Sequence, residues 1–224
     1  MATHLDLEEQ EQLDQLKHFW AKYGNLITLT LVLALGGFAA WNGWQFWQNR
    51  SAVQAAVLYD ELERAVQARD AERVQRVVAD LQSQHSRTLQ AAQGGLLAAR
   101  TLHDAQKPDE ARAALQWVVD KGSDDAYQAI ARVRLAGLLM DKQAYDEAIK
   151  VLDAKMPPSM APLAADRRGD VLMAQGQRDA AKAAYLAAYR DMPVEAGYRN
   201  LIEAKLAALG VAVGEDAATK EKTP

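Results

Sequence analysis

The chain has 224 residues, half of them hydrophobic and a quarter charged, which is enough for one sizeable globular domain with an attached segment. Its 26 basic and 30 acidic residues give a formal net charge of −4, without the basic excess that is typical of nucleic-acid-binding proteins. The absence of cysteine excludes disulfides, thiolate metal sites and cysteine nucleophiles, and the four histidines form no i, i+4 pair that would indicate a helical zinc site. Abundant alanine with few prolines and glycines favours an all-α protein.

A long uncharged segment lies near the N-terminus. No charged side chain occurs between Lys22 and Arg50, and residues 26–41 are almost continuously apolar. Because a bilayer core about 30 Å thick requires roughly 20 helical residues, we predict one transmembrane helix within residues 23–49, surrounded by lipid. The expected interface residues are the aromatic belts and the first leucine of the run, namely Trp20, Tyr23, Leu26, Trp41, Trp44 and Trp47. A buried core helix of a soluble protein is the alternative.

The residues around this segment bear on its topology. Residues 1–22 form a short acidic tail that lacks the basic region of a secretory signal peptide, so we expect an uncleaved signal anchor. Basic residues are nearly balanced across the span, but a short tail before it and a large domain after it favour a cytoplasmic N-terminus and a translocated domain. Gly36 and Ala40 form a small-x-x-x-small pair that would let a second membrane helix approach closely.

Beyond the span, residues 50–213 have the pattern of helices separated by short polar turns, and no window alternates with the period of a strand. The predicted helices cover residues 51–69, 71–84, 88–105, 109–121, 125–140, 145–154, 161–175, 179–191 and 194–209. Residues 214–224 contain no apolar residue larger than alanine, which predicts a disordered tail.

An internal repeat appears when the second helices of successive pairs are aligned. The segments 109–115, 146–152 and 179–185 superpose, with their aligned alanines 37 and 33 residues apart, close to the 34-residue tetratricopeptide repeat. The predicted packing positions are small residues at the helix crossing, larger residues that fill the next gap, and the end of the third copy. They are Ala99, Ala136 and Gly169; Ala111, Ala148 and Ala181; Leu115, Leu152 and Tyr185; and Ala188 with Pro193. The pair at 51–84 barely matches, and an ordinary alanine-rich bundle is the alternative to a degenerate tetratricopeptide-like α-solenoid.

A stack of helix pairs offers a concave surface lined by its first helices, which is suited to holding a protein or peptide. We predict that ten residues face this groove: Leu96, Arg100 and His103; Ile130, Val133 and Met140; and Leu163, Asp166, Asp170 and Met173. The methionines suit recognition of varied apolar segments. The sequence has no glycine-rich phosphate loop or nucleophile elbow, so we expect no catalytic residue and no cofactor. The histidine spacing and the charge balance lead us to expect no metal and no nucleic acid.

The whole pattern resembles the YfgM family of ancillary subunits of the bacterial SecYEG translocon. The resemblance is carried by the acidic tail, the aromatic-flanked span, the repeat-like domain and local similarity at residues 43–47, 146–153 and 165–172. It implies an inner-membrane protein with a periplasmic C-terminal domain. It also implies association with the translocon and with the membrane-anchored prolyl isomerase PpiD, and help for newly translocated chains on their way to periplasmic chaperones.

Two other functions stay open from the sequence. The first is a membrane-anchored scaffold that assembles an envelope or respiratory complex by binding folded subunits. The second is a regulatory role, in which the acidic tail contacts a soluble regulator. Crosslinking to emerging chains or channel subunits, as opposed to one defined partner, distinguishes the translocon accessory from the scaffold, and loss of binding on deleting residues 1–16 would support the regulatory role.

Overall fold

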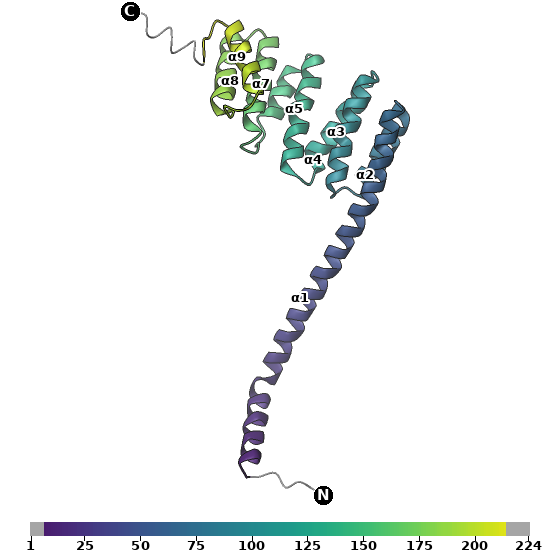
Figure 1. Cartoon of the computed structure of the whole chain (residues 1–224), viewed down its shortest axis with the longest axis vertical. Coiled ribbons are helices and arrows are strands. Elements are labelled where there is room, and N and C mark those ends of the chain that lie inside the picture. Colours follow the sequence, from purple (N-terminus) through teal and green to yellow (C-terminus); the bar gives the residue numbers. More distant parts are fainter. Residues whose placement is uncertain (1–6, 214–224) are drawn as a thin grey trace, which may run out of the picture. The chain divides into compact units, whose positions relative to one another are not determined.

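The computed structural model describes residues 7–213, and the regular elements of that range are α-helices, as predicted (Figure 1). The helices are α1 (Leu7–Gln67), α2 (Ala71–Gln84), α3 (Leu89–Asp104), α4 (Pro108–Lys121), α5 (Asp125–Asp141), α6 (Tyr145–Leu152), α7 (Ala161–Ala174), α8 (Arg178–Asp191) and α9 (Tyr198–Ala208). The predicted disordered tail at 214–224 and the first part of the acidic tail lie outside the described residues. The chain divides into two compact units, Met1–Ser51 and Ala52–Pro224, which we describe separately.

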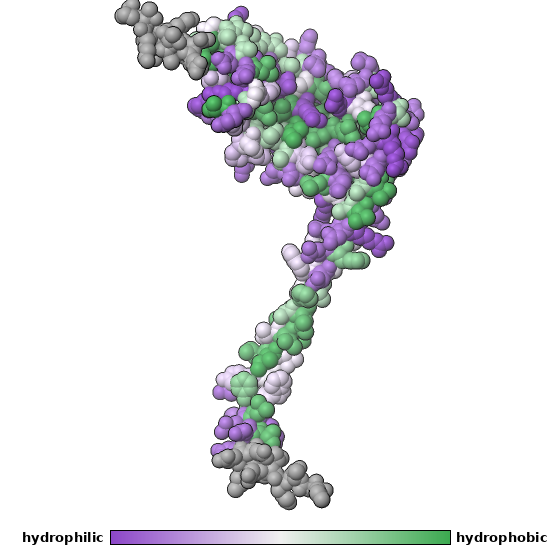
Figure 2. All heavy atoms as spheres, in the orientation of Figure 1, coloured by the Kyte–Doolittle hydropathy of each residue, from purple (hydrophilic) through white to green (hydrophobic). Residues whose placement is uncertain are grey.

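In the first unit, α1 carries a stretch that is long and apolar enough to cross a membrane, the one such stretch in the part of the chain that the structure describes. Its apolar side chains are exposed along the helix, whereas the core helix of a soluble protein would bury them (Figure 2). Two of its polar side chains bond within the helix: Thr30 Oγ1 donates to the Leu26 carbonyl (2.8 Å) and Asn42 Nδ2 to the Phe38 carbonyl (2.9 Å). Internal satisfaction of polar groups is what a hydrocarbon environment demands.

The second unit is a series of antiparallel helix pairs. The end of α1 pairs with α2, and α3 with α4, α5 with α6 and α7 with α8 follow, each pair packing against the next. Three clusters of buried residues form a core that continues along the series, rich in alanine where helices cross and in leucine and valine between them. This arrangement confirms the prediction of stacked helix pairs.

One turn recurs at the end of every first helix. It places a residue at positive φ, at Arg69, Gln106, Gln143 and Gly176, with φ between 55° and 77°. The amide of the following residue donates to a carbonyl five residues earlier, as in Asp70 to Ala65 (3.0 Å). These four positions are 37, 37 and 33 residues apart, so the helix pairs repeat with one register.

The last helix follows the same rule, because α9 ends in this turn at Gly210, 34 residues after Gly176. Val211 donates to the Leu206 carbonyl at 3.0 Å, as Gln177 does to Leu172 at 2.9 Å. We therefore identify α9 as a fifth first helix. It covers the apolar side of the last pair, as terminal helices of repeat proteins commonly do.

The first helix pair belongs to the repeat in the structure, although its sequence barely matches the other pairs. In the register of the turns, Leu62, Val74 and Val78 are equivalent to Ala99, Ala111 and Leu115 of the next pair, and all are buried. The larger residues at the crossing hide the pattern in the sequence. Space for them comes from Gly94 of α3, where a Cβ atom would lie 2.9 Å from Leu81 and 3.1 Å from Leu62.

Candidate partner-binding face

The first helices of successive pairs lie side by side, with the end of α1 against α3, α3 against α5 and α5 against α7. We call the surface that they form the first-helix face and define it by Val66, Leu97, Arg100, Arg134 and Arg167. Stacked helix pairs use such extended surfaces to bind other proteins. The first-helix face is therefore the candidate partner-binding surface.

A depression of about 550 Å³ opens on the first-helix face between the end of α1 and the second half of α3. It is lined by Val66, Arg69, Leu97, Arg100, Thr101, Asp104 and Ala105. Three of these residues are aliphatic and two are arginines, so the depression offers apolar surface beside positive charge. A larger hollow of about 820 Å³ lies at the turns around residues 123–126 and 155–158, but it is more open.

Arg100 lines the depression and Arg134 lies beside it, and neither has a carboxylate partner among the described residues. Arg134 reaches from α5 to α3, where its Nη1 donates to the Leu96 carbonyl at 3.3 Å. Burial, and secondarily the positive charge of Arg100, lowers the pKa of Arg134. Arg134 and Arg167 occupy the same register, 33 residues apart, and Arg167 lies against α5 beside Gly137, but it forms an ion pair with Asp170 (3.4 Å).

Tyrosine side chains cover another part of the same helices. Gln93 Nε2 of α3 donates to the Tyr127 hydroxyl of α5 at 2.6 Å. Tyr59 of α1 lies against α3 near Gly94, and burial, followed by the charge of Glu63, raises its pKa. These half-buried groups combine apolar area with polar tips, a combination that is enriched at protein interfaces.

The residues predicted to line the groove are spread over three environments. Arg100 and His103 are exposed; Ile130, Val133, Met140, Leu163, Asp170 and Met173 are half-buried; and Leu96 and Asp166 are only 6% and 1% exposed. Leu96 and Asp166 therefore offer no surface to a partner. They lie on the side of the first helix that faces the next one, since the Leu96 carbonyl accepts from α5 and Asp166 bonds to Lys205 of α9. Arg100 is the predicted residue that lines the depression.

Asp166 and Asp170 belong to a charge network that holds α9 against α7 and α8. Lys205 Nζ donates to both oxygens of Asp166 (2.8 and 2.9 Å) and to Asp170 (2.7 Å). The hydroxyls of Tyr198 and Tyr185 donate to Asp166 (2.7 Å) and Asp170 (2.8 Å). Burial and these carboxylates raise the pKa of both tyrosines well above the usual value. The network fixes the terminal helix, so its role is structural.

The predicted packing residues lie where helices cross. Of the eleven, all except Pro193 are buried, and Pro193 follows the end of α8. Gly169 shows how close the crossing is, because a Cβ atom there would lie 2.4 Å from the ring of Tyr185. Close crossings at small residues and a larger residue in the next gap are the packing that the repeat alignment predicts.

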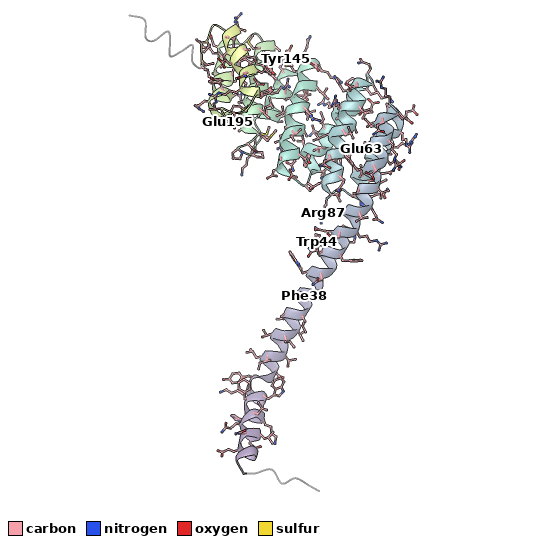
Figure 3. All side chains as sticks on the ribbon, in the orientation of Figure 1. Phe38, Trp44, Glu63, Arg87, Tyr145 and Glu195 are labelled. Atoms are coloured by element: carbon pink, nitrogen blue, oxygen red, sulfur yellow. The ribbon has the colours of Figure 1, made fainter. Side chains whose placement is uncertain are left out.

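The predicted membrane-interface residues Trp20, Tyr23, Leu26, Trp41, Trp44 and Trp47 are all exposed in the first unit. Phe38 and Trp44 project from α1 (Figure 3), and the rings of Trp44 and Trp47 lie 5.9 Å apart. Gly36 has open space around it, and Ala40 one turn later is exposed. These placements suit lipid contact, and contact with a second membrane helix at Gly36 and Ala40 stays a prediction.

No cluster of three or more His, Asp or Glu side chains suited to a metal ion occurs among the residues that the structure describes. The described part of the chain thus combines an exposed apolar helix with a tetratricopeptide-like stack of helix pairs whose first-helix face carries an amphipathic depression. These features define a class of protein: a tetratricopeptide-like helical-repeat protein with one candidate membrane span in the part of the chain that the structure describes.

Comparison with known proteins identifies the family. Residues 17–211 match the model of the tetratricopeptide repeat-like domain. The chain is 36% identical over 213 residues to the ancillary SecYEG translocon subunit of Neisseria gonorrhoeae, covering 93% of this chain and 100% of that protein. The proteins of the same name from Haemophilus influenzae and Escherichia coli are 27% and 26% identical, each over 79% of this chain and over 86% and 85% of their own lengths. The chain belongs to the family of ancillary SecYEG translocon subunits, as the resemblance to YfgM predicted.

Proposed function

We propose that this chain is an ancillary subunit of the SecYEG translocon in the bacterial inner membrane and acts by binding proteins, without catalysing a reaction. The observation that carries the proposal is its similarity, over 93% of its length, to a protein of that name. In this proposal residues 23–49 span the membrane, residues 1–22 are cytoplasmic, and residues 50–213 form the periplasmic domain. The domain binds emerging chains or partner proteins and aids their transfer to chaperones, with PpiD as a neighbour in the membrane.

The exposed side chains of α1 support the membrane part of this proposal. Aromatic residues at both ends of the apolar stretch and internally bonded polar side chains are suited to a helix that meets lipid on all sides. A short acidic tail and a large domain favour translocation of the C-terminal part. Protease treatment of spheroplasts tests the orientation: we expect a C-terminal tag to be removed from outside, and protection of the tag would place the domain in the cytoplasm.

The first-helix face supports the binding part. A photocrosslinking amino acid at Leu97, which lines the depression, should form adducts with channel subunits or translocating chains during active secretion. The matched control is Lys182, which is exposed on the second helix α8. Adducts of equal yield from both positions would contradict a partner site on the first-helix face.

The alternative of a scaffold for an envelope or respiratory complex makes a different prediction in the same experiment. A scaffold should give one defined adduct from Leu97 that persists when secretion is blocked. An accessory subunit for translocating chains should lose its adducts with those chains when no precursor enters the channel.

A further inference from the structure

The strongest unassigned feature of the second unit is positive charge without a matching acid on the first-helix face. Some arginines elsewhere in the unit are paired with carboxylates, as Arg73 is with Glu61 (3.0 Å) and Arg112 with Glu147 (2.8 Å). Arg100 and Arg134 have no ion-pair partner among the residues that the structure describes. They come from adjacent first helices, and Arg134 donates to the carbonyl of Leu96, which lies one helical turn before Arg100 on α3. Burial first, and the charge of Arg100 second, lower the pKa of Arg134.

Arg100 and Arg134 are both exposed, and the guanidinium of Arg134 donates to the Leu96 carbonyl. One bond leaves most of the guanidinium donors unused, since this group can donate five N–H bonds. A carboxylate placed between Arg100 and Arg134 would accept from both and remove their repulsion, and the planar guanidinium fork suits that geometry.

The acids near this site do not neutralise it. Asp104 lines the same depression as Arg69 and Arg100, yet it forms no ion pair with either of them. Glu63, on the last turns of α1 (Figure 3), acts electrostatically on Tyr59. The depression and its margin therefore keep a net positive charge beside the aliphatic side chains of Val66 and Leu97.

The dimensions of the face favour an extended chain over a small anion. Packed helices are about 8–10 Å apart, so a path from the end of α1 across α3 to α5 is about 20 Å long. An extended peptide rises about 3.3 Å per residue and would cover that path with roughly six residues. Such a segment could place carboxylates on the arginines and an apolar side chain in the depression at the same time.

We propose that the first-helix face binds an extended acidic segment of a partner protein, with carboxylates on Arg100 and Arg134 and an apolar side chain between Val66 and Leu97. This inference names the partner chemistry of the face and rests on the proposed function as a protein-binding subunit. It makes the site selective for segments that combine negative charge with an aliphatic residue. Neutral apolar segments would fill the depression but leave the arginines without a partner.

The test measures binding of a fluorescent short peptide composed of Asp, Glu and Leu to the full-length chain in lipid nanodiscs. We expect Arg100→Gln combined with Arg134→Gln to weaken binding by about tenfold or more, because two charge-assisted contacts are lost. The control combines Arg76→Gln with Arg178→Gln, which makes the same charge change at exposed positions on the second helices α2 and α8. A matched peptide of Asn, Gln and Leu tests the need for carboxylates.

Three results would overturn the proposal. The two double variants could bind equally, the acidic and the neutral peptide could bind equally, or the acidic peptide could fail to bind the unaltered chain. The exposed variant Arg100→Gln alone guards against misfolding and should weaken binding by several-fold. Failure here is distinguishable from failure of the proposed function, because crosslinking of the chain to channel subunits would continue without any acidic segment on this face.

Discussion

The charge network at the end of the stack gives a sharp prediction, because replacing Lys205 with Met leaves Asp166 buried without its countercharge. Asp166 is 1% exposed and would keep only the hydrogen bond from Tyr198. Removing one partner of a buried ion pair costs about 3–5 kcal/mol. The side chain of Lys205 is 22% exposed, so solvent screens part of the interaction and we expect about 2–3 kcal/mol.

The loss should appear first in α9, which lies at the end of the stack and opens locally. Hydrogen exchange of its backbone amides in the full-length chain should accelerate by a factor of about 30 to 150, at roughly tenfold per 1.4 kcal/mol. The control is Lys182→Met, which removes the same charge at an exposed position of α8. The double variant Asp166→Leu with Lys205→Met should recover part of the stability, because no unpaired buried charge is left. Equal exchange of α9 in the Lys205 and Lys182 variants would refute the reasoning.

Three further changes test the packing, the alkaline stability and the helix caps. Gly169→Ala should destabilise the domain by about 1–3 kcal/mol in urea unfolding, since the new Cβ would meet the ring of Tyr185 at 2.4 Å; unchanged stability would mean that the crossing is loose. The pKa of Tyr198 is raised in the fold above 10.0, so its stabilising contribution is complete below that pH and lost as pH rises further. Tyr198→Phe should therefore lose stability less steeply above about pH 10, and an identical alkaline slope would contradict this. Asp70→Ala removes the side-chain cap of α2 (3.0 Å to a backbone amide) and should cost about 1 kcal/mol in thermal unfolding, whereas no loss would show that the cap is dispensable.

Helix pairs with small residues at a regular spacing could be predicted from the sequence. The first pair could not, because its larger side chains fit only where a neighbouring helix carries a glycine. The alanines at 111, 148 and 181 are small because two helices cross there, so their spacing alone indicated the stack. In the first pair the equivalent position is Val74, and Ala99 is replaced by Leu62, for which Gly94 of α3 leaves space. The positive-φ turns also escape prediction, since Arg, Gln or Gly occupies the same place in different pairs.

The sequence predicted a groove on the first helices, and the structure places the candidate depression between the end of α1 and α3. The prediction from apolar and charged residues on the first helices included Arg100, which lines the depression. It also included Leu96 and Asp166, which are buried on the side of the helix that packs against the next first helix. Arg134 was missed, although its 33-residue spacing from Arg167 was available in the sequence. The partner of Asp166, Lys205, is 39 residues away and required the register of α9 to be known.

The central claim is that this chain is a membrane-anchored subunit of the SecYEG translocon, and isolation of the tagged full-length chain from native membranes in mild detergent tests it most directly. The account predicts that the channel subunits co-purify in constant proportion, and that they do so less when residues 23–49 are replaced by an unrelated single span. Recovery of the chain without channel subunits, at expression levels close to the native one, would contradict the account.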